Sequence, residues 1–415
     1  MLQLAFVNFR KGSYILVEGK AESSRFFIIQ GGKVQITKDT EVVAEEGGNV
    51  LGAGDFIGVV SSMSGHSQIE TAIALTDVTL ISVSRDQFPE LIEKNTPVAM
   101  KIIYSFTKKM RYLDEALTRI TLKKNIESDI THLYSIGEYY AKLSKYSLAL
   151  YAYYHYLKNA PSGQYATAAR ERFMALKSMG VAVTADLLEP KTNEMTRVFQ
   201  QEAMVFCECQ PGAELYIIQK GQVKITKIVD NNEVLLAVLK TGDMFGEMAL
   251  LENKPRSASA IAQEGTQLLA VNRQNFNQMV STQPQLIARL TTTLADRIWL
   301  MYKQLANTLI KDPVSRMYDM LMIQEEKLKV TFQAGKAYTF DFGPTELANM
   351  CGISKEKVHQ VVGEFLREPI IKIVDDRIMV TDLLELSKQN AYRKKLMDME
   401  RSRNESRSTN STVLW

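Results

Sequence analysis

The feature of this sequence that most restricts its possible folds is an internal repeat. The segment FFIIQGGKVQITK at positions 26–38 returns as LYIIQKGQVKITK at positions 215–227. The similarity continues in register, because Gly-Asp precedes an apolar residue at 54–56 and again at 242–244. Each copy alternates short apolar runs with glycines and ends in an apolar-periodic helix, a pattern typical of an antiparallel barrel followed by a helix. The repeat therefore predicts two related barrels in one chain.

The segment between the two barrels, at 128–178, has no strand pattern and is rich in Ala, Leu, Tyr and Lys. Its packing residues, such as Leu133, Gly137 and Tyr153, fall at the spacing of a tetratricopeptide repeat. One and a half such units are too few to bury their own faces, because solenoid repeats need neighbours. We expect a helical spacer, with a peptide-binding groove as the open alternative.

The helix after the second barrel is predicted from Pro284 to Thr308 by apolar residues every three or four positions. These residues are Leu286, Leu290, Leu294, Ile298, Met301 and Leu305. Such a stripe needs a partner surface. Packing on its own barrel is one interpretation, and pairing with the same helix of a second chain in a homodimer is the favoured one.

The densest polar motif lies in the second copy, where Gly246-Glu247-Met248 is followed after a short gap by Arg256-Ser257. A glycine lets the backbone approach a ligand, and a short helix opening at Met248 would direct its amides at an anion. A guanidinium can hold two phosphate oxygens, a serine hydroxyl adds a donor, and a carboxylate accepts from sugar hydroxyls. These five residues therefore predict a site for a ribose phosphate.

This motif resembles the phosphate-binding cassette of the cyclic-nucleotide-binding domain in the catabolite activator (Crp-Fnr-like) family of transcription regulators. The resemblance covers residues 195–308 and, more loosely, the first barrel. It implies that Glu247 meets the ribose 2′-hydroxyl and that Arg256 and Ser257 meet the cyclic phosphate. Cyclic AMP is the first candidate ligand, with cyclic GMP and cyclic dinucleotides open. Met301 and Tyr302 replace the family's base-contacting threonine and serine, and Tyr302 is the candidate base contact.

The first copy carries other side chains at the three clamp positions. In register they are Val59, Gln68 and Ile69. A buried cyclic phosphate would lack its countercharge and its hydroxyl donor there, which costs several kilocalories per mole. We therefore expect the first barrel to bind no ordinary cyclic nucleotide and to serve in packing or dimerisation, with another ligand as the alternative.

Residues 342–358 have the spacing of a helix-turn-helix motif. Ala348 is the small residue where two helices touch, Gly352 permits the turn, and Ser354 is a suitable N-cap for the second helix. Two strands around Asp375-Asp376 then predict a wing, and the family resemblance extends to this winged reader. The candidate DNA contacts are Ser354, Lys355, Glu356, Lys357, Gln360 and Arg377.

Composition limits the remaining possibilities. With 50 Lys and Arg against 47 Asp and Glu, the net charge is only +3, so DNA contact has to come from a local patch. No apolar run is long enough for a membrane span, and Cys207, Cys209 and Cys351 predict neither a disulfide framework nor a metal site. The patterns of nucleophilic triads, P-loops and dinucleotide folds are missing, so we expect a cytoplasmic protein that is not an enzyme.

These patterns predict a multidomain α+β fold with two antiparallel jelly-roll barrels, a helical spacer and a C-terminal winged helix-turn-helix. The expected domains are 1–122 (degenerate barrel and helix), 123–190 (spacer), 191–311 (nucleotide-binding barrel and long helix), 312–390 (DNA reader) and 391–415 (basic polar tail, expected to be disordered).

The predicted function is a bacterial, cyclic-nucleotide-responsive transcription regulator that binds duplex DNA as a homodimer, with RNA polymerase as a further candidate partner. Ligand in the second barrel would move the long helix and so reposition two readers on a two-fold-symmetric operator. Two alternatives stay open: a nucleotide-sensing scaffold or regulatory subunit that acts on a protein partner, and a constitutive DNA binder with a non-functional pocket.

Overall fold

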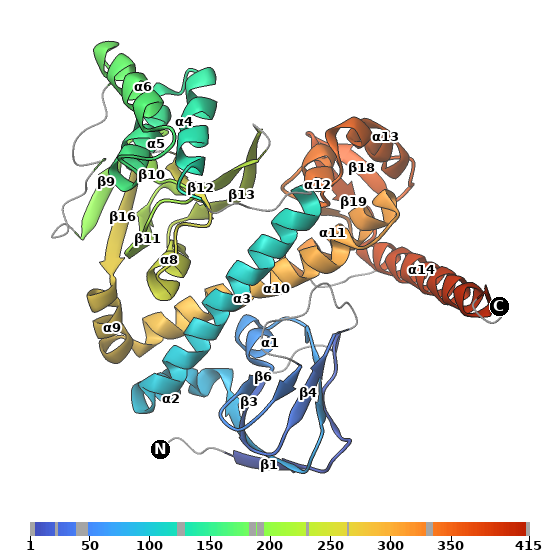
Figure 1. The fold of residues 1–415 in the computed structure, drawn as a ribbon. Helices are drawn as coiled ribbons and strands as arrows, with labels where there is room; N and C mark the ends of the chain where they lie inside the picture. The colour runs from blue at the N-terminus through green and yellow to red at the C-terminus, as the bar shows by residue number, and fades with distance from the viewer. Residues whose placement is uncertain are drawn as a thin grey trace.

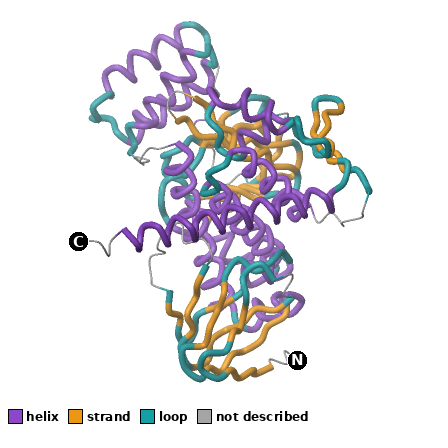
Figure 2. Tube along the Cα trace, turned by 90° about the vertical axis from the view of Figure 1, so that its right-hand side faces the viewer, coloured by secondary structure: helices purple, strands orange, loops and turns teal. Residues whose placement is uncertain are grey.

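The computed structural model describes residues 5–20, 24–38, 49–122, 129–181, 188, 195–229, 232–263, 265–328 and 335–411 (Figure 1). Two groups of strands lie on either side of a central layer of helices (Figure 2). In the described part of the chain, no helix combines the length and the apolar character that crossing a membrane requires.

The first barrel has two four-stranded sheets with strand orders β1-β8-β3-β6 and β2-β7-β4-β5. Its strands are β1 (Ala5–Phe9), β2 (Tyr14–Leu16), β3 (Arg25–Gly31), β4 (Val34–Thr37), β5 (Val50–Leu51), β6 (Phe56–Ile57), β7 (Thr71–Ala74) and β8 (Val78–Ser84). Helix α1 (Val59–Ser64) lies between β6 and β7, and after β8 follow η1 (Arg85–Gln87), α2 (Phe88–Lys94) and α3 (Thr96–Leu122).

The second barrel repeats this plan, with strand orders β14-β11-β16-β9 and β10-β15-β12-β13. Its strands are β9 (Thr196–Phe199), β10 (Met204–Phe206), β11 (Glu214–Lys220), β12 (Gln222–Val229), β13 (Asn232–Lys240), β14 (Met244–Phe245), β15 (Ser259–Ala262) and β16 (Thr266–Asn272). Helix α8 (Glu247–Glu252) corresponds to α1, and α9 (Arg273–Thr282) and α10 (Pro284–Thr308) follow β16.

The strand register confirms that the repeat in sequence is a repeat in structure. Ile28 pairs with Ile81 between β3 and β8, and Ile217 pairs with Leu269 at the matching place between β11 and β16. Alternate residues face the interior, as the burial pattern of β4 shows, because successive side chains of a strand point to opposite faces. Each barrel encloses its own apolar core.

The two long helices, α3 and α10, pack against each other between the barrels (Figure 1). Buried residues of the α10 stripe, including Leu290, Leu294 and Ile298, belong to one apolar cluster with Ile103 and Phe106 of α3. The expectation that this stripe pairs with a second chain is therefore corrected. A helix of the same chain covers it, because the repeat supplies a second apolar stripe on α3, a helix of 27 residues beside the 25 of α10.

The spacer comprises α4 (His132–Lys142), α5 (Tyr146–Asn159) and α6 (Ala166–Ser178). The first two helices approach closely at Gly137, where a Cβ atom would lie 2.5 Å from the Tyr153 ring. Apolar residues of α4 and α5 share a cluster with Met204, Cys207 and Ile261 of the second barrel. The spacer therefore lies against this barrel instead of extending away from it.

The C-terminal unit contains α11 (Pro313–Leu328), α12 (Pro344–Met350), α13 (Lys355–Phe365) and a three-stranded sheet. The sheet has the order β17-β19-β18 and is formed by β17 (Tyr338–Thr339), β18 (Ile371–Val374) and β19 (Arg377–Val380).

The last helix, α14 (Leu383–Ser411), corrects the expectation of a disordered tail at 391–415 as far as residue 411, and residues 412–415 lie outside the described residues. Its composition includes Lys, Arg, Leu and Met, which are good helix formers. Two of its cations also have partners in the unit, because Arg393 binds Glu368 at 2.7 Å and Lys394 binds Asp319 at 2.6 Å.

Candidate functional site

The cassette of the second barrel is built around the start of α8. Gly246 precedes this helix with φ +79°, a left-handed conformation that glycine adopts without strain. A Cβ atom here would also lie 2.6 Å from a guanidinium nitrogen of Arg256. The Gly246 carbonyl accepts a hydrogen bond of 2.8 Å from Arg256 Nη1. The glycine thus brings the backbone against the arginine, and the approach of a ligand to this backbone stays a prediction.

Arg256 lies inside the barrel with 5% of its surface exposed. Its guanidinium lies over the ring of Phe206, 4.1 Å from the centroid. Two carboxylates, Glu214 and Glu247, act electrostatically on Arg256. Each of them pairs with another arginine: Glu214 with Arg197 at 2.7 Å, and Glu247 with Arg297 at 3.3 Å. Burial lowers the pKa of the Arg256 guanidinium. Among the described residues, this buried cation therefore has no carboxylate of its own.

Glu247 is the first residue of α8 and is 2% exposed. Arg297 of α10 contacts it through Nη1 at 3.3 Å and donates a second bond to the Met244 carbonyl. Glu247, the candidate acceptor for the ribose hydroxyl, is therefore linked to α10 by an ion pair. Sequence reasoning missed Arg297 because it considered only the apolar stripe of α10 and not the polar positions beside it.

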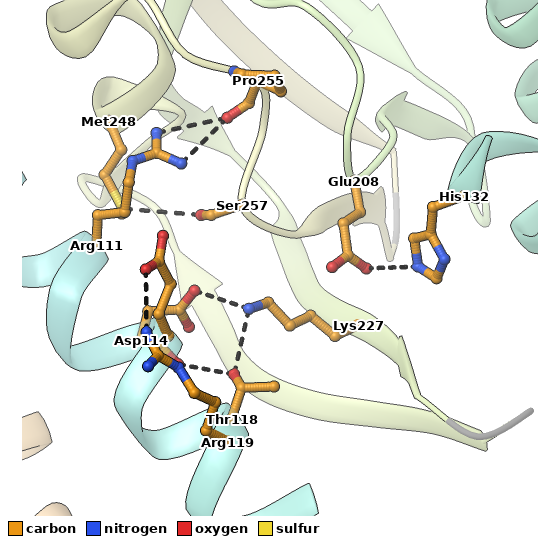
Figure 3. A network of polar contacts seen from close by, with 11 residues as sticks. Arg111, Asp114, Thr118, Arg119, His132, Glu208, Lys227, Met248, Pro255 and Ser257 are labelled. Atoms are coloured by element: carbon orange, nitrogen blue, oxygen red, sulfur yellow. Dashed lines mark hydrogen bonds and ion pairs between the residues drawn. The ribbon is translucent and has the colours of Figure 1, made fainter. Parts of the chain in front are cut away.

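Ser257 and Met248 lie together at the other end of the cassette. The Ser257 hydroxyl contacts the Met248 sulfur at 3.8 Å, and both residues are half-buried (Figure 3). The structure therefore brings Gly246, Glu247, Met248, Arg256 and Ser257 into one region around α8. Within the described residues, no group of three acidic, cysteine or histidine side chains could hold a metal ion.

Helix α3 of the first half closes one side of this region (Figure 3). Arg111 binds Glu252 of α8 at 2.9 Å and the Pro255 carbonyl at 3.4 Å. Asp114 binds Lys227 of β12 at 2.7 Å, and Lys227 is only 3% exposed. Sequence reasoning missed these contacts, although the repeat contained a signal: Lys227 and Lys38 occupy the same position in the two copies.

Tyr302 does not join the second pocket, so the expectation of a base contact there is corrected. Its hydroxyl accepts a hydrogen bond from Lys38 of the first barrel, and the Lys38 ammonium lies 4.2 Å from the centre of its ring. The physical reason is the crossing of the long helices. Each one presents this part of its length to the opposite barrel, so Tyr302 of α10 faces the first barrel as Asp114 of α3 faces the second.

The cassette of the first barrel has the same backbone and different chemistry. Gly58 precedes α1 with φ +72°, and Val59 is the first residue of this helix. Gln68 takes the place of Arg256 and is 3% exposed. Both polar atoms of its amide lack a hydrogen-bond partner among the described residues. Ile69 is buried, so the three clamp positions carry no charge.

The helix pair α12 and α13 has the turn that the sequence predicted. Gly352 has φ +63°, and Ala348 is completely buried where the helices meet. Ser354 is the N-cap residue of α13, with its backbone carbonyl accepting from Lys357 N–H at 2.9 Å but without a side-chain capping bond. The turn between β18 and β19 has left-handed Asp375 and Asp376, which is typical of a tight hairpin.

Most candidate DNA contacts lie together on the exposed face of α13. Glu356, Lys357 and Gln360 are exposed, and the Gln360 amide donates to Glu364 at 3.0 Å. The side chain of Lys355 lies outside the described residues. Arg377 lies apart at the hairpin, where it binds Asp341 at 3.3 Å. Ser354 is exposed at the start of α13.

The C-terminal unit is attached to α10 through buried polar contacts. Asn307, near the end of α10, donates to the Arg316 carbonyl at 2.9 Å and to Asp319 at 3.0 Å. Arg316 in turn donates to the Cys351 carbonyl at 3.0 Å, at the turn between α12 and α13. The position of α13 therefore depends on the position of α10. Cys351 is buried, as expected for a core residue.

Comparison with known proteins identifies the two barrels. The profile of the cyclic nucleotide-binding domain matches residues 6–95 and 196–283. This match identifies two cyclic nucleotide-binding domains, and the chain is similar to Crp-Fnr-like regulators. A CRP-like cAMP-activated global transcriptional regulator of Mycobacterium tuberculosis is 25% identical over 52% of this chain and 95% of its own length. The cyclic AMP receptor protein of Thermus thermophilus is 29% identical over 43% of this chain and 79% of its own length.

Among solved structures, CooA from Carboxydothermus hydrogenoformans covers 50% of this chain and 96% of its own, with 18% identity and a TM-score of 0.40. By their names, the Mycobacterium tuberculosis and Thermus thermophilus relatives are a cAMP-activated transcriptional regulator and a cyclic AMP receptor protein. The two barrels predicted from the repeat are thus confirmed as cyclic nucleotide-binding domains.

Proposed function

We propose that this chain is a cyclic-nucleotide-responsive, DNA-binding transcription regulator of the bacterial cytoplasm, and that its second barrel binds the ligand. The observation that carries this proposal is the buried guanidinium of Arg256, which has no ion pair among the described residues. A buried charge is costly unless an opposite charge compensates it. A cyclic phosphate supplies that charge, and cyclic AMP is the first candidate, with cyclic GMP and cyclic dinucleotides as alternatives.

In the proposed complex, Arg256 holds the cyclic phosphate, with the Ser257 hydroxyl and the amides beside Gly246 and Met248 as further donors. Glu247 accepts from the ribose 2′-hydroxyl. Because the Arg256 side chain is already held by the Gly246 carbonyl and the Phe206 ring, little side-chain entropy is lost when the ligand binds.

The response reaches the C-terminal unit through α10. A ribose hydroxyl at Glu247 competes with Arg297 for the carboxylate, and this changes the contact between α8 and α10. The displacement passes along α10 to Asn307, which is bonded to α11. A coupling free energy of about 1–3 kcal/mol, or 5- to 150-fold in DNA affinity, is sufficient for such regulation.

The C-terminal unit acts as a winged helix-turn-helix, in which α13 enters the major groove and the hairpin of β18 and β19 is the wing. Ser354, Lys355, Glu356 and Gln360 contact base edges, while Lys357 and Arg377 contact the backbone or neighbouring bases. A contact with RNA polymerase and the tetratricopeptide-like role of the spacer stay predictions.

The ligand part of the proposal is tested by calorimetric titration with cyclic AMP, cyclic GMP and cyclic di-GMP. The wild type should bind one of them, and Arg256→Leu should lose this binding. Gln68→Leu is the matched control, because it removes the corresponding polar side chain of the first barrel. Binding in Arg256→Leu, or equal loss in both variants, would contradict the assigned pocket. Binding to none of the three would favour a non-functional pocket.

The DNA part is tested by fluorescence anisotropy with a duplex selected by the full-length protein from a random pool. Lys357→Ala should weaken binding and reduce the salt slope by about one unit, because one phosphate contact is lost. Arg367→Ala is the control, since it removes an exposed cation just beyond the C-terminal end of α13. Equal affinity and salt slope in Lys357→Ala, Gln360→Ala and the wild type would favour a scaffold that acts on a protein partner.

A further inference from the structure

The pairing of long helices is complete within one chain. Buried apolar residues line the contact from both sides, with Ile103, Phe106 and Met110 on α3 and Leu294 and Ile298 on α10. All five are at most 5% exposed. A second chain could not use this surface without first separating α3 from α10, which would expose both stripes to water.

The cassettes also find their partners within the chain. Helix α8 of the second barrel packs against α3, and α1 of the first barrel packs against α10. Polar contacts hold both arrangements: Arg111 to Glu252 at 2.9 Å on one side, and His66 to Asp296 at 3.1 Å on the other. His66 also stacks on the buried Trp299, with 4.2 Å between ring centroids. One chain thus contains a two-barrel unit in which each long helix packs against the other long helix and against the cassette of the opposite barrel.

The two halves differ in the segments that come after their long helices. Helix α10 continues into the unit that carries α12 and α13, whereas α3 is followed in the chain by the spacer. The spacer lies on the second barrel, where the Tyr151 hydroxyl donates to the Val205 carbonyl and the Tyr140 hydroxyl to Glu233. The two-barrel unit therefore has one helix-turn-helix among its described residues, with a different helical domain in the other half.

From this arrangement we infer that the regulator binds DNA as a single chain with a single reader, and that its target is an asymmetric half-site. This inference rests on the proposed function. Regulators with two readers in a symmetric dimer recognise inverted half-sites about 34–36 Å apart, because the symmetry of the protein is copied in the operator. A unit whose first half is followed by a spacer instead of a reader has no matching symmetry, so the expected two-fold operator is replaced by one half-site.

The stoichiometry is tested with the full-length chain and a longer form that carries an amino-terminal fusion domain. Both are mixed with a duplex selected from a random pool, and the complexes are resolved by gel mobility shift. Single-chain binding gives two bands, one for each form. A dimer gives a third, intermediate band. The inference expects two bands, at all protein concentrations and with or without saturating cyclic AMP.

The selected sequences give a second readout. We expect one asymmetric motif, and a duplex with two inverted copies should bind its first chain with no more than a two-fold statistical gain over a duplex with one copy. A selected inverted repeat, a third band or cooperative binding of two chains would overturn the inference while supporting DNA binding. No selected sequence, together with no loss of affinity in Lys357→Ala, would overturn the proposed function and the inference with it.

Discussion

The two barrels of this chain have nearly the same backbone around their cassettes. Gly58 and Gly246 are both left-handed and both start a six-residue helix. The backbone N–H of Gln68 donates to the Lys20 carbonyl at 3.0 Å, and the N–H of Arg256 donates to the Gln210 carbonyl at 2.9 Å. The fold therefore holds positions 68 and 256 in equivalent places, whichever side chain is present.

The chemistry of the two cassettes is different. The second barrel has a buried cation and a buried carboxylate, whereas the first has a neutral amide and aliphatic side chains. This comparison teaches that the backbone of the cassette does not depend on the charged clamp. Glycine conformation and apolar packing maintain the structure, and three side chains decide whether an anion has a counterion.

The largest effect is expected when the second clamp is converted to the first. The triple variant Glu247→Val, Arg256→Gln, Ser257→Ile should keep the barrel folded but reduce cyclic-nucleotide affinity at least about 1,000-fold, since loss of one buried charge partner alone costs about 2–5 kcal/mol. Calorimetry measures the affinity and circular dichroism the fold. Retained affinity would show that these residues are not the ligand site.

The contact between α3 and the second barrel should be the next most sensitive feature. Asp114→Ala leaves the buried Lys227 ammonium without its carboxylate, which we expect to cost about 3–5 kcal/mol of unfolding free energy. Tyr302→Phe is the matched change on the other side, where Lys38 is partly exposed, and should cost less than about 1 kcal/mol. Chemical denaturation measures both. Equal costs would mean that the two cross-barrel contacts are equivalent.

A smaller effect is expected from Glu247→Gln, which keeps the shape of the side chain and removes its charge. One charge-assisted hydrogen bond contributes about 1.5–3 kcal/mol, so nucleotide affinity should fall about 10- to 100-fold. The contact with Arg297 weakens as well, and the ligand should therefore change DNA affinity less than in the wild type. Unchanged coupling, measured by anisotropy at saturating ligand, would exclude the path through Arg297.

The smallest effect is expected from Gln68→Leu in the first barrel. Both amide atoms of Gln68 are buried without partners among the described residues, so an apolar side chain of similar size should stabilise the protein by about 1 kcal/mol. Thermal unfolding tests this. A clear loss of stability would instead indicate that a bound molecule satisfies the amide, which would revive the alternative of another ligand in this barrel.

The sequence by itself determined the two barrels, the cassette and the turn of the helix pair. These features depend on local rules: alternation for strands, glycine where φ is positive, as at Gly246 and Gly352, and a charged pair at fixed spacing. Both barrels follow these local rules, so their sequences can be aligned. The alignment shows that the clamp residues of the second barrel are replaced in the first. The composition of the tail was misleading, since α14 continues to Ser411 with anchors at Glu368 and Asp319.

Only the tertiary structure decided which surfaces meet. An apolar stripe on α10 requires a partner, but periodicity is the same whether that partner is a second chain or α3. The pairing of Asp114 with Lys227, the contact of Arg297 with Glu247 and the turn of Tyr302 toward Lys38 join residues far apart in the chain. Such contacts depend on how the long helices cross, and that crossing results from the packing of all the side chains between them.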